Sequence, residues 1–136
     1  MGRPRARSVP EAGLTLDTGA LIAIERGDGR MVALLDRLAA RGGARFAVPA
    51  AALAQAWRGA PRQVRLARFL ALPEVEVVPL DEPAARAVGV LCGAAQTADV
   101  VDAAVVLCAR ERQHRVVTSD PDDLGRLDPT LGLIAL

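Results

Sequence analysis

The chain has 136 residues, a net charge of +1 and 51% apolar residues. One domain of this size buries an ordinary core without disulfides or metal ions. The near-neutral charge argues against a protein that binds nucleic acid through bulk charge alone. All 17 strongly basic residues are arginine. Arginine suits bidentate contacts to phosphate, but a bias in the codon composition of the genome is the explanation that we favour.

Cys92 and Cys108 lie in apolar helical segments without the spacing of zinc-ligand pairs. We expect two buried thiols in a reducing cytoplasm. No apolar run approaches the ~20 residues that span a bilayer, so no membrane partner is predicted. Residues 1–13 are rich in arginine but lack the apolar stretch of a signal peptide. We expect a flexible arm there, with contact to RNA as the alternative.

Short β-branched runs alternate with helical patterns along the rest of the chain. The predicted strands are residues 13–17, 45–48, 75–80, 115–118 and 131–136. The predicted helices are residues 18–24, 31–41, 49–57, 62–71 and 81–93, one that begins near 99 and one that begins near 121. In the helix at 62–71, the expected buried positions are Val64, Ala67, Leu70 and Ala71. The alternation predicts an α/β fold, with a parallel sheet covered by helices on both faces.

Four aspartates occupy element ends in this pattern. Asp17 and Asp120 each follow a strand, whereas Asp99 and Asp102 begin a helix three residues apart, on one face. The strand carboxyl ends of a parallel sheet lie at one edge, where such folds place their sites. If the two strands are neighbours, three or four carboxylates converge within a few ångströms and repel one another. Oxygen ligands without His or Cys favour Mg²⁺ or Mn²⁺, which suits phosphodiester hydrolysis.

Structural interpretations of the same residues stay open. Asp17, Asp99 and Asp120 also suit helix N-caps, with Asp102 at the third helical position. The only histidine, His114, has no evident Ser or Cys partner and is expected to be a solvated loop residue, so no triad is predicted. No glycine-rich nucleotide loop is present. An aspartate-based phosphotransferase is disfavoured, because Asp17 is followed by Thr-Gly and the chain has no lysine.

Three segments, LDTGALIAI, DVVDAAVVLCA and VVTSDPDDL, together resemble the motifs of PIN domains over residues 14–136. The likeness is closest to VapC-type toxins of VapBC toxin–antitoxin pairs. This resemblance implies a three-layer α/β/α sandwich around a parallel sheet, a Mg²⁺- or Mn²⁺-dependent ribonuclease site, a cognate antitoxin and a homodimer. By motif match, Asp17, Asp102 and Asp120 are the catalytic and metal-binding acids, and Asp99 is a further ligand.

The same resemblance implies that Thr18, Arg58 and Ser119 contact the RNA substrate. Arg58 as a simple surface residue is an equal alternative. Asp122 and Asp123 are set aside, because they lie further around the helix cap.

One position departs from the family pattern. Toxin members carry a glutamate on the helix after the second strand, where the stretch VPAAALAQAWR has Gln55. A neutral amide removes one charge from the site. Two hypotheses follow: a metal-dependent endoribonuclease toxin, or a catalytically degenerate PIN domain that binds protein or RNA without cutting. Trp57 is expected in the core or an interface rather than stacked on a base.

Overall fold

The structure is a computed structural model, and it describes residues 13–136. The arm predicted at residues 1–13 therefore lies outside the described residues, apart from Gly13. Gly13 pairs with Arg45 as the first residue of the first strand. Gly13, which was assigned to the arm, therefore belongs to this strand.

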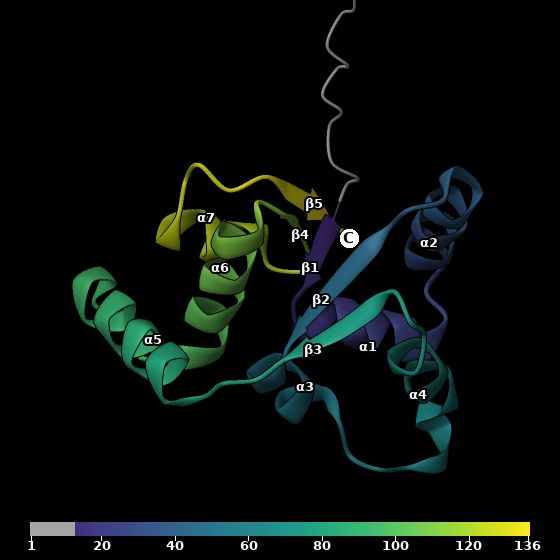
Figure 1. The fold of residues 1–136 in the computed structure, drawn as a ribbon, viewed down its shortest axis with the longest axis horizontal. Helices are drawn as coiled ribbons and strands as arrows, with labels where there is room; N and C mark the ends of the chain where they lie inside the picture. Colours follow the sequence, from purple (N-terminus) through teal and green to yellow (C-terminus); the bar gives the residue numbers. More distant parts are fainter. Residues whose placement is uncertain (1–12) are drawn as a thin grey trace, which may run out of the picture.

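Five strands, all parallel to their neighbours, form one central sheet. They are β1 (Gly13–Leu16), β2 (Arg45–Pro49), β3 (Val75–Val78), β4 (Arg115–Thr118) and β5 (Leu133–Ala135). Their order is β3-β2-β1-β4-β5, so the first and fourth strands are neighbours at the centre (Figure 1). The central strands are almost wholly buried, whereas the edge strands are partly exposed and shorter than predicted.

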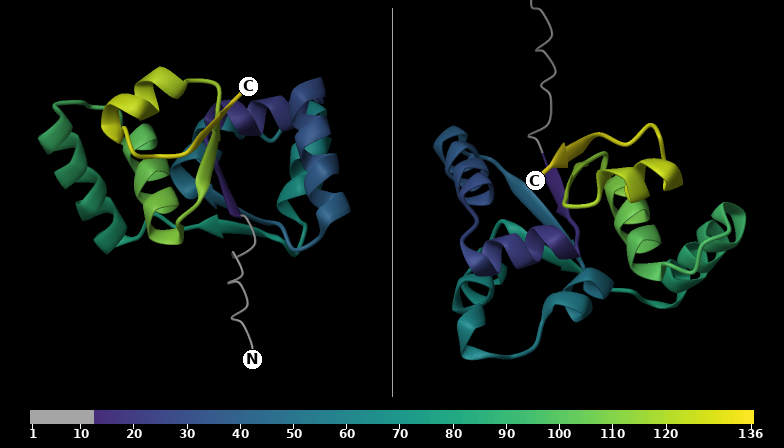
Figure 2. Two further views of the ribbon diagram at one scale, coloured as in Figure 1. Left: turned by 90° about the horizontal axis from the view of Figure 1, so that it is seen from above. Right: turned by 180° about the vertical axis from the view of Figure 1, so that it is seen from behind.

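Helices cover both faces of this sheet, as the alternating pattern predicts. They are α1 (Thr18–Arg26), α2 (Gly29–Arg41), α3 (Ala50–Ala56), α4 (Val64–Leu70), α5 (Glu82–Ala95), α6 (Val100–Arg112) and α7 (Pro121–Leu127). Helices α1, α2 and α4 lie on one side of the sheet, and α5, α6 and α7 lie on the other (Figures 1 and 2). The arrangement is the predicted α/β/α sandwich.

Helix α6 packs closely on the sheet because its inner side chains are small. Ala103, Val105, Val106 and Ala109 are fully buried. The same helix also carries α5, through a small apolar cluster that includes Val88. In the described part of the chain, no single helix is long and apolar enough to cross a membrane. Only α5 and α6 taken together reach that composition, and they are bent by 111° relative to each other.

The predicted buried face of α4 is wrong. Val64 is 50% exposed, whereas Leu66 and Phe69 are buried. A 3₁₀ turn at Pro61–Gln63 precedes the helix and places the Gln63 side chain inside. The Gln63 amide donates hydrogen bonds to the Ala56 carbonyl (2.9 Å) and to Glu25 (2.7 Å). Satisfying this buried amide, together with the apolar contacts of Leu66 and Phe69, sets the rotation of the helix.

The thiols of Cys92 and Cys108 are buried and free, in agreement with the prediction of core cysteines. His114, by contrast, is not a solvated loop residue. Its ring is half-buried, with Nδ1 3.1 Å from the Thr15 hydroxyl, and burial lowers its pKa. The ring packs against Gly13, where a Cβ atom would lie 2.0 Å from Nε2. The turn residue is therefore part of the packing beneath β1.

Candidate functional site

Asp17 lies directly after β1, at the carboxyl edge of the sheet, and caps α1. Its Oδ1 accepts a hydrogen bond from the Ala20 backbone N–H at 2.8 Å. Only 5% of the residue is exposed. Burial raises its pKa, although hydrogen bonds from Thr118 and from the backbone N–H groups of Ala20 and Ser119 oppose that effect. Burial disfavours the negative charge of this carboxylate, which binding of a proton or of a cation would compensate.

Asp120 reaches the same edge from the neighbouring strand. Its backbone N–H donates to the hydroxyl of the fully buried Thr118 at 2.7 Å. Asp120 occupies the predicted N-cap position of α7, but its carboxylate makes no cap hydrogen bond to that helix. The negative charge of Asp120 contributes to the raised pKa of Asp17. Thr118 therefore contacts both acids. The only sequence signal for this role was a threonine at the end of an apolar strand.

Asp99 and Asp102 begin α6, as predicted. The Oδ1 atom of Asp99 accepts a hydrogen bond from the Asp102 backbone N–H at 3.0 Å, which confirms Asp99 as the N-cap. The pKa of Asp102 is raised from 3.8 to about 7. Burial is the largest cause, followed by the carboxylates of Asp99, Asp123 and Asp17. Acids from two strand ends and two helix starts thus interact electrostatically.

Asp123, which was set aside on sequence grounds, lies near Asp102. It lines a groove of about 320 Å³ together with Asp99 and Asp102. Its Oδ1 forms an ion pair with Arg126 at 2.9 Å. The overlooked signal was spacing, because Asp123 follows Asp120 by three residues and so lies near it on one side of α7.

The predicted convergence of carboxylates is only partly realised. Among residues 13–136, no group of three His, Cys, Asp or Glu side chains is arranged to hold a metal ion. Asp17 and Asp99 instead direct an oxygen at helix N–H groups. The donor chemistry still suits a hard cation, since it is oxygen only, and burial together with the neighbouring carboxylates disfavours the charged form of Asp102 when no cation is bound. Mg²⁺ commonly takes one or two carboxylates and keeps several waters, so this set fits it.

Gln55 borders the acids through Thr18. The Thr18 hydroxyl donates to Gln55 Oε1 at 2.7 Å, which places the amide beside the first turn of α1. Arg58 lies beyond the end of α3, where its guanidinium donates to the Trp57 carbonyl at 2.7 Å. Trp57 itself is 40% exposed, so it does not lie in the core, and its predicted place in an interface stays a prediction. Helix α3 ends at Ala56, and the backbone of Trp57 is extended.

Comparisons with known proteins agree with this arrangement. The PIN domain family model matches residues 14–128. The chain belongs to the PIN domain family. A search of curated protein sequences finds no match.

The same fold occurs in solved structures from three bacteria. VapBC2 from Rickettsia felis, bound to a DNA fragment from its promoter, is 18% identical with a TM-score of 0.68, covering 91% of this chain and 98% of that chain. A toxin–antitoxin complex from Klebsiella pneumoniae is 17% identical with a TM-score of 0.66, covering 92% and 97%. FitAcB from Neisseria gonorrhoeae is 21% identical with a TM-score of 0.62, covering 89% and 96%. The resemblance to VapC-type toxins is confirmed for the fold.

The Ser119 backbone N–H donates to Asp17, and its side chain joins this PIN site by packing. A Cβ atom at Gly19 would lie 1.8 Å from Ser119 Oγ and 3.4 Å from Asp17 Oδ1. Glycine at this position therefore lets the turn after β4 approach the start of α1. The close approach brings the Ser119 hydroxyl beside the most buried acid.

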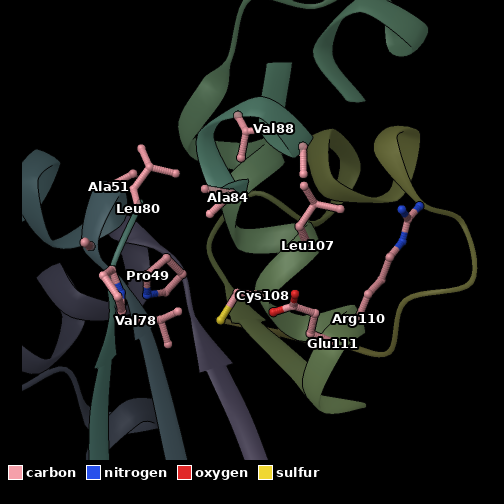
Figure 3. A pocket seen from close by; sticks show the side chains of 14 residues that line it. Pro49, Ala51, Val78, Leu80, Ala84, Val88, Leu107, Cys108, Arg110 and Glu111 are labelled. Carbon is pink, nitrogen blue, oxygen red and sulfur yellow. The ribbon is translucent and has the colours of Figure 1, made fainter. Parts of the chain in front are cut away.

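An apolar pocket of about 140 Å³ lies apart from these acids, between the ends of β2 and β3 and the helices α5 and α6 (Figure 3). Leu80, Val88 and Leu107 line it, and Cys108 lies at its side. Burial raises the pKa of this thiol. None of the four predicted aspartates lines the pocket, so it is separate from the PIN site.

Proposed function

We propose that the protein is a metal-dependent endoribonuclease, the toxin of a toxin–antitoxin pair. The single observation that carries the proposal is the electrostatic coupling of Asp102 to Asp17, Asp99 and Asp123 at the carboxyl edge of the sheet. Such a group of acids destabilises its own charged form unless a cation is bound. Membership of the PIN family and the fold of the toxin–antitoxin neighbours support the same assignment.

Asp17, Asp102 and Asp120 would hold Mg²⁺ or Mn²⁺, with Asp99 as a further ligand and Asp123 nearby. The cation, when bound, lowers the pKa of water and neutralises charge on the phosphodiester. Thr118 keeps Asp17 and Asp120 in place from β4.

Thr18 follows Asp17 in the chain and Ser119 packs against Gly19, so the hydroxyls of both residues would contact the RNA phosphate. Arg58 would bind the next part of the strand. These polar groups would orient the RNA at the acids.

A cognate antitoxin and a second copy of this chain are the partners that we propose, in the cytoplasm. The antitoxin follows from the neighbours, which were solved as toxin–antitoxin complexes or with promoter DNA. The homodimer is supported by large apolar residues that are exposed at the surface. Val90 on α5 is 73% exposed, and Leu80 and Val77 near the end of β3 are also exposed.

The decisive experiment is cleavage of a mixed single-stranded RNA by purified protein with Mn²⁺, Mg²⁺ or EDTA. Wild type is expected to cut only with a divalent cation, and Asp102→Asn is expected to lose that activity while staying folded. Asp122→Asn serves as the matched control, because Asp122 is an exposed acid outside the groove. Equal metal-dependent cleavage by wild type and by Asp102→Asn would refute the proposed role of this acid.

Gln55 favours a second candidate, a degenerate PIN domain that binds RNA or protein without cutting. The amide occupies the position next to Thr18 where a glutamate would add negative charge. Mn²⁺ titration separates the two functions, because an ion that binds the folded nuclease raises the melting temperature of the protein. Absence of both Mn²⁺ binding and cleavage would establish the non-enzymatic alternative.

A further inference from the structure

A hollow of about 560 Å³ lies beside the acidic site, between the last turn of α1, the end of α3 and the start of α4. Four arginines from these three segments line it, together with one glutamate and one glutamine. They are Arg26, Arg58, Arg62, Arg65, Glu25 and Gln55. A chain with a net charge of only +1 therefore gathers a strong local excess of positive charge here.

The single carboxylate in the hollow is already engaged. Glu25 forms an ion pair with Arg62 at 3.2 Å and accepts a hydrogen bond from Gln63 at 2.7 Å. Within residues 13–136, neither Arg26 nor Arg65 forms a salt bridge, and Arg58 donates only to backbone carbonyls. Three guanidinium groups are thus available to an anionic ligand.

The frame that carries these arginines is braced from inside. Gln63 is buried, and its Oε1 accepts hydrogen bonds from the backbone N–H groups of Arg58 (2.8 Å) and Gly59 (3.0 Å). Its amide reaches Glu25 on α1 and the carbonyl of Ala56 on α3. One side chain therefore ties together all three segments of the hollow. The arginines are held on a fixed surface rather than on a loose loop.

Gln55 connects the hollow to the acidic site. Gln55 lies in the wall of the hollow, and the Gln55 Oε1 atom accepts the hydrogen bond from Thr18, the residue after Asp17. Helix α1 runs from Thr18 to Arg26 over ~13.5 Å, so the arginines extend away from the acids along this helix. On the other side, Asp99, Asp102 and Asp123 present negative charge. A polyanion would therefore reach Asp17 from the arginine side.

We propose that this hollow is a phosphate-binding track for single-stranded RNA. The strand would pass Arg65 and Arg26, then Arg58 and Gln55, before it reaches Asp17. Arginine binds phosphate bidentately, and a basic groove beside an exposed aromatic ring is typical of single-strand binding. Trp57 is 40% exposed and lies in the chain between Ala56 and Arg58, which both line the hollow, so it is the aromatic residue that a bound strand would reach. This inference rests on the proposed nuclease function for its direction, but the binding can be measured without cleavage.

The test uses the full chain with Asp102→Asn, so that the RNA stays intact, and a fluorescein-labelled single-stranded RNA of mixed sequence. Trp57 is the only tryptophan and no tyrosine is present, so quenching of its fluorescence reports contact directly. Added to this background, Arg26→Gln and Arg65→Gln are each expected to reduce the salt slope, log Kobs against log [salt], by about 0.7. If the affinities are equal at 1 M salt, this change in slope lowers the RNA affinity at 0.1 M salt about fivefold for each variant. The double variant is expected to lose about 25-fold.

Arg68→Gln is the matched control, because Arg68 is exposed on the same helix and does not line the hollow. It is expected to leave affinity and slope unchanged. The pair Arg26→Lys and Arg65→Lys keeps the charge and is expected to keep the slope. If the lysine pair loses binding as completely as the glutamine pair, or if the glutamine pair binds like its background, the track does not exist.

The outcomes also separate this inference from the proposed nuclease. If the glutamine pair binds RNA more weakly and wild type never cuts RNA, the track is supported and the nuclease function is refuted. If wild type shows metal-dependent cleavage and the glutamine pair binds RNA as its background does, the nuclease function is supported and the track is refuted. Poly-glutamate in place of RNA tests the other anionic ligand. If the glutamine pair loses poly-glutamate binding while RNA binding is unaffected, the hollow belongs to an acidic protein partner and the inference is overturned.

Discussion

Replacing Asp102 by asparagine is expected to stabilise the metal-free protein above pH 7 and to change its stability little at pH 4. The pKa of Asp102 is raised from 3.8 to about 7 by burial and by neighbouring carboxylates. Between those pH values the native state holds a proton that the unfolded chain has released. The free energy of unfolding of wild type therefore falls as the pH rises through this range. Asparagine has no charge to develop, so the variant escapes the loss.

The size of the effect follows from the two pKa values. Their difference corresponds to an upper limit of about 4 kcal/mol. Because the Asp102 side chain is only half-buried, water screens much of this repulsion, and about 1–2 kcal/mol is a realistic gain. For a domain of this size that gain raises the melting temperature by about 3–10 °C. An effect of this size is readily measured.

The assay is thermal unfolding followed by circular dichroism in EDTA, at pH 4 and at pH 8. Asp122→Asn is melted alongside as the control for removing an exposed acid. Added Mn²⁺ should then raise the melting temperature of wild type more than that of Asp102→Asn. If wild type and Asp102→Asn differ by the same amount at both pH values, the electrostatic coupling inferred for this site is refuted.

Three further changes test the site and its frame. Gln55→Glu adds a carboxylate beside the acids and should tighten Mn²⁺ binding in calorimetric titration; unchanged affinity would argue against a shared site. Gly19→Ala places a Cβ against the serine that follows β4, so it should lower the stability by about 1–3 kcal/mol and reduce cleavage. Gly29→Ala is the control, because a Cβ there meets nothing, and it should change neither stability nor cleavage. Leu66→Ala should cost about 2–5 kcal/mol in denaturant unfolding and Val64→Ala below ~0.5 kcal/mol; similar costs would contradict the observed rotation of α4.

Features that depend on a few adjacent residues were predictable from the sequence. The alternation of strands and helices follows from hydrophobic periodicity, and the α/β/α sandwich was found where that pattern predicted it. Asp99 was identified as a cap because a cap hydrogen bond spans only three residues. The placement of Asp17 and Asp120 at one edge followed from the parallel sheet alone. These inferences needed no knowledge of which helix faces touch.

Contacts between distant segments decided the rest. The α4 face was mispredicted because Gln63, a polar residue, is buried by partners on α1 and α3 that no local pattern reveals. Asp123 approaches Asp102 only because α7 packs against α6. The raised pKa of Asp102 depends first on burial between the packed elements, with smaller effects from Asp123 and Asp17. The arginine hollow likewise gathers charges from segments that lie apart in the chain. Local hydrogen bonds and periodicity are encoded within one or two helical turns, whereas burial and electrostatic coupling exist only after the layers have packed.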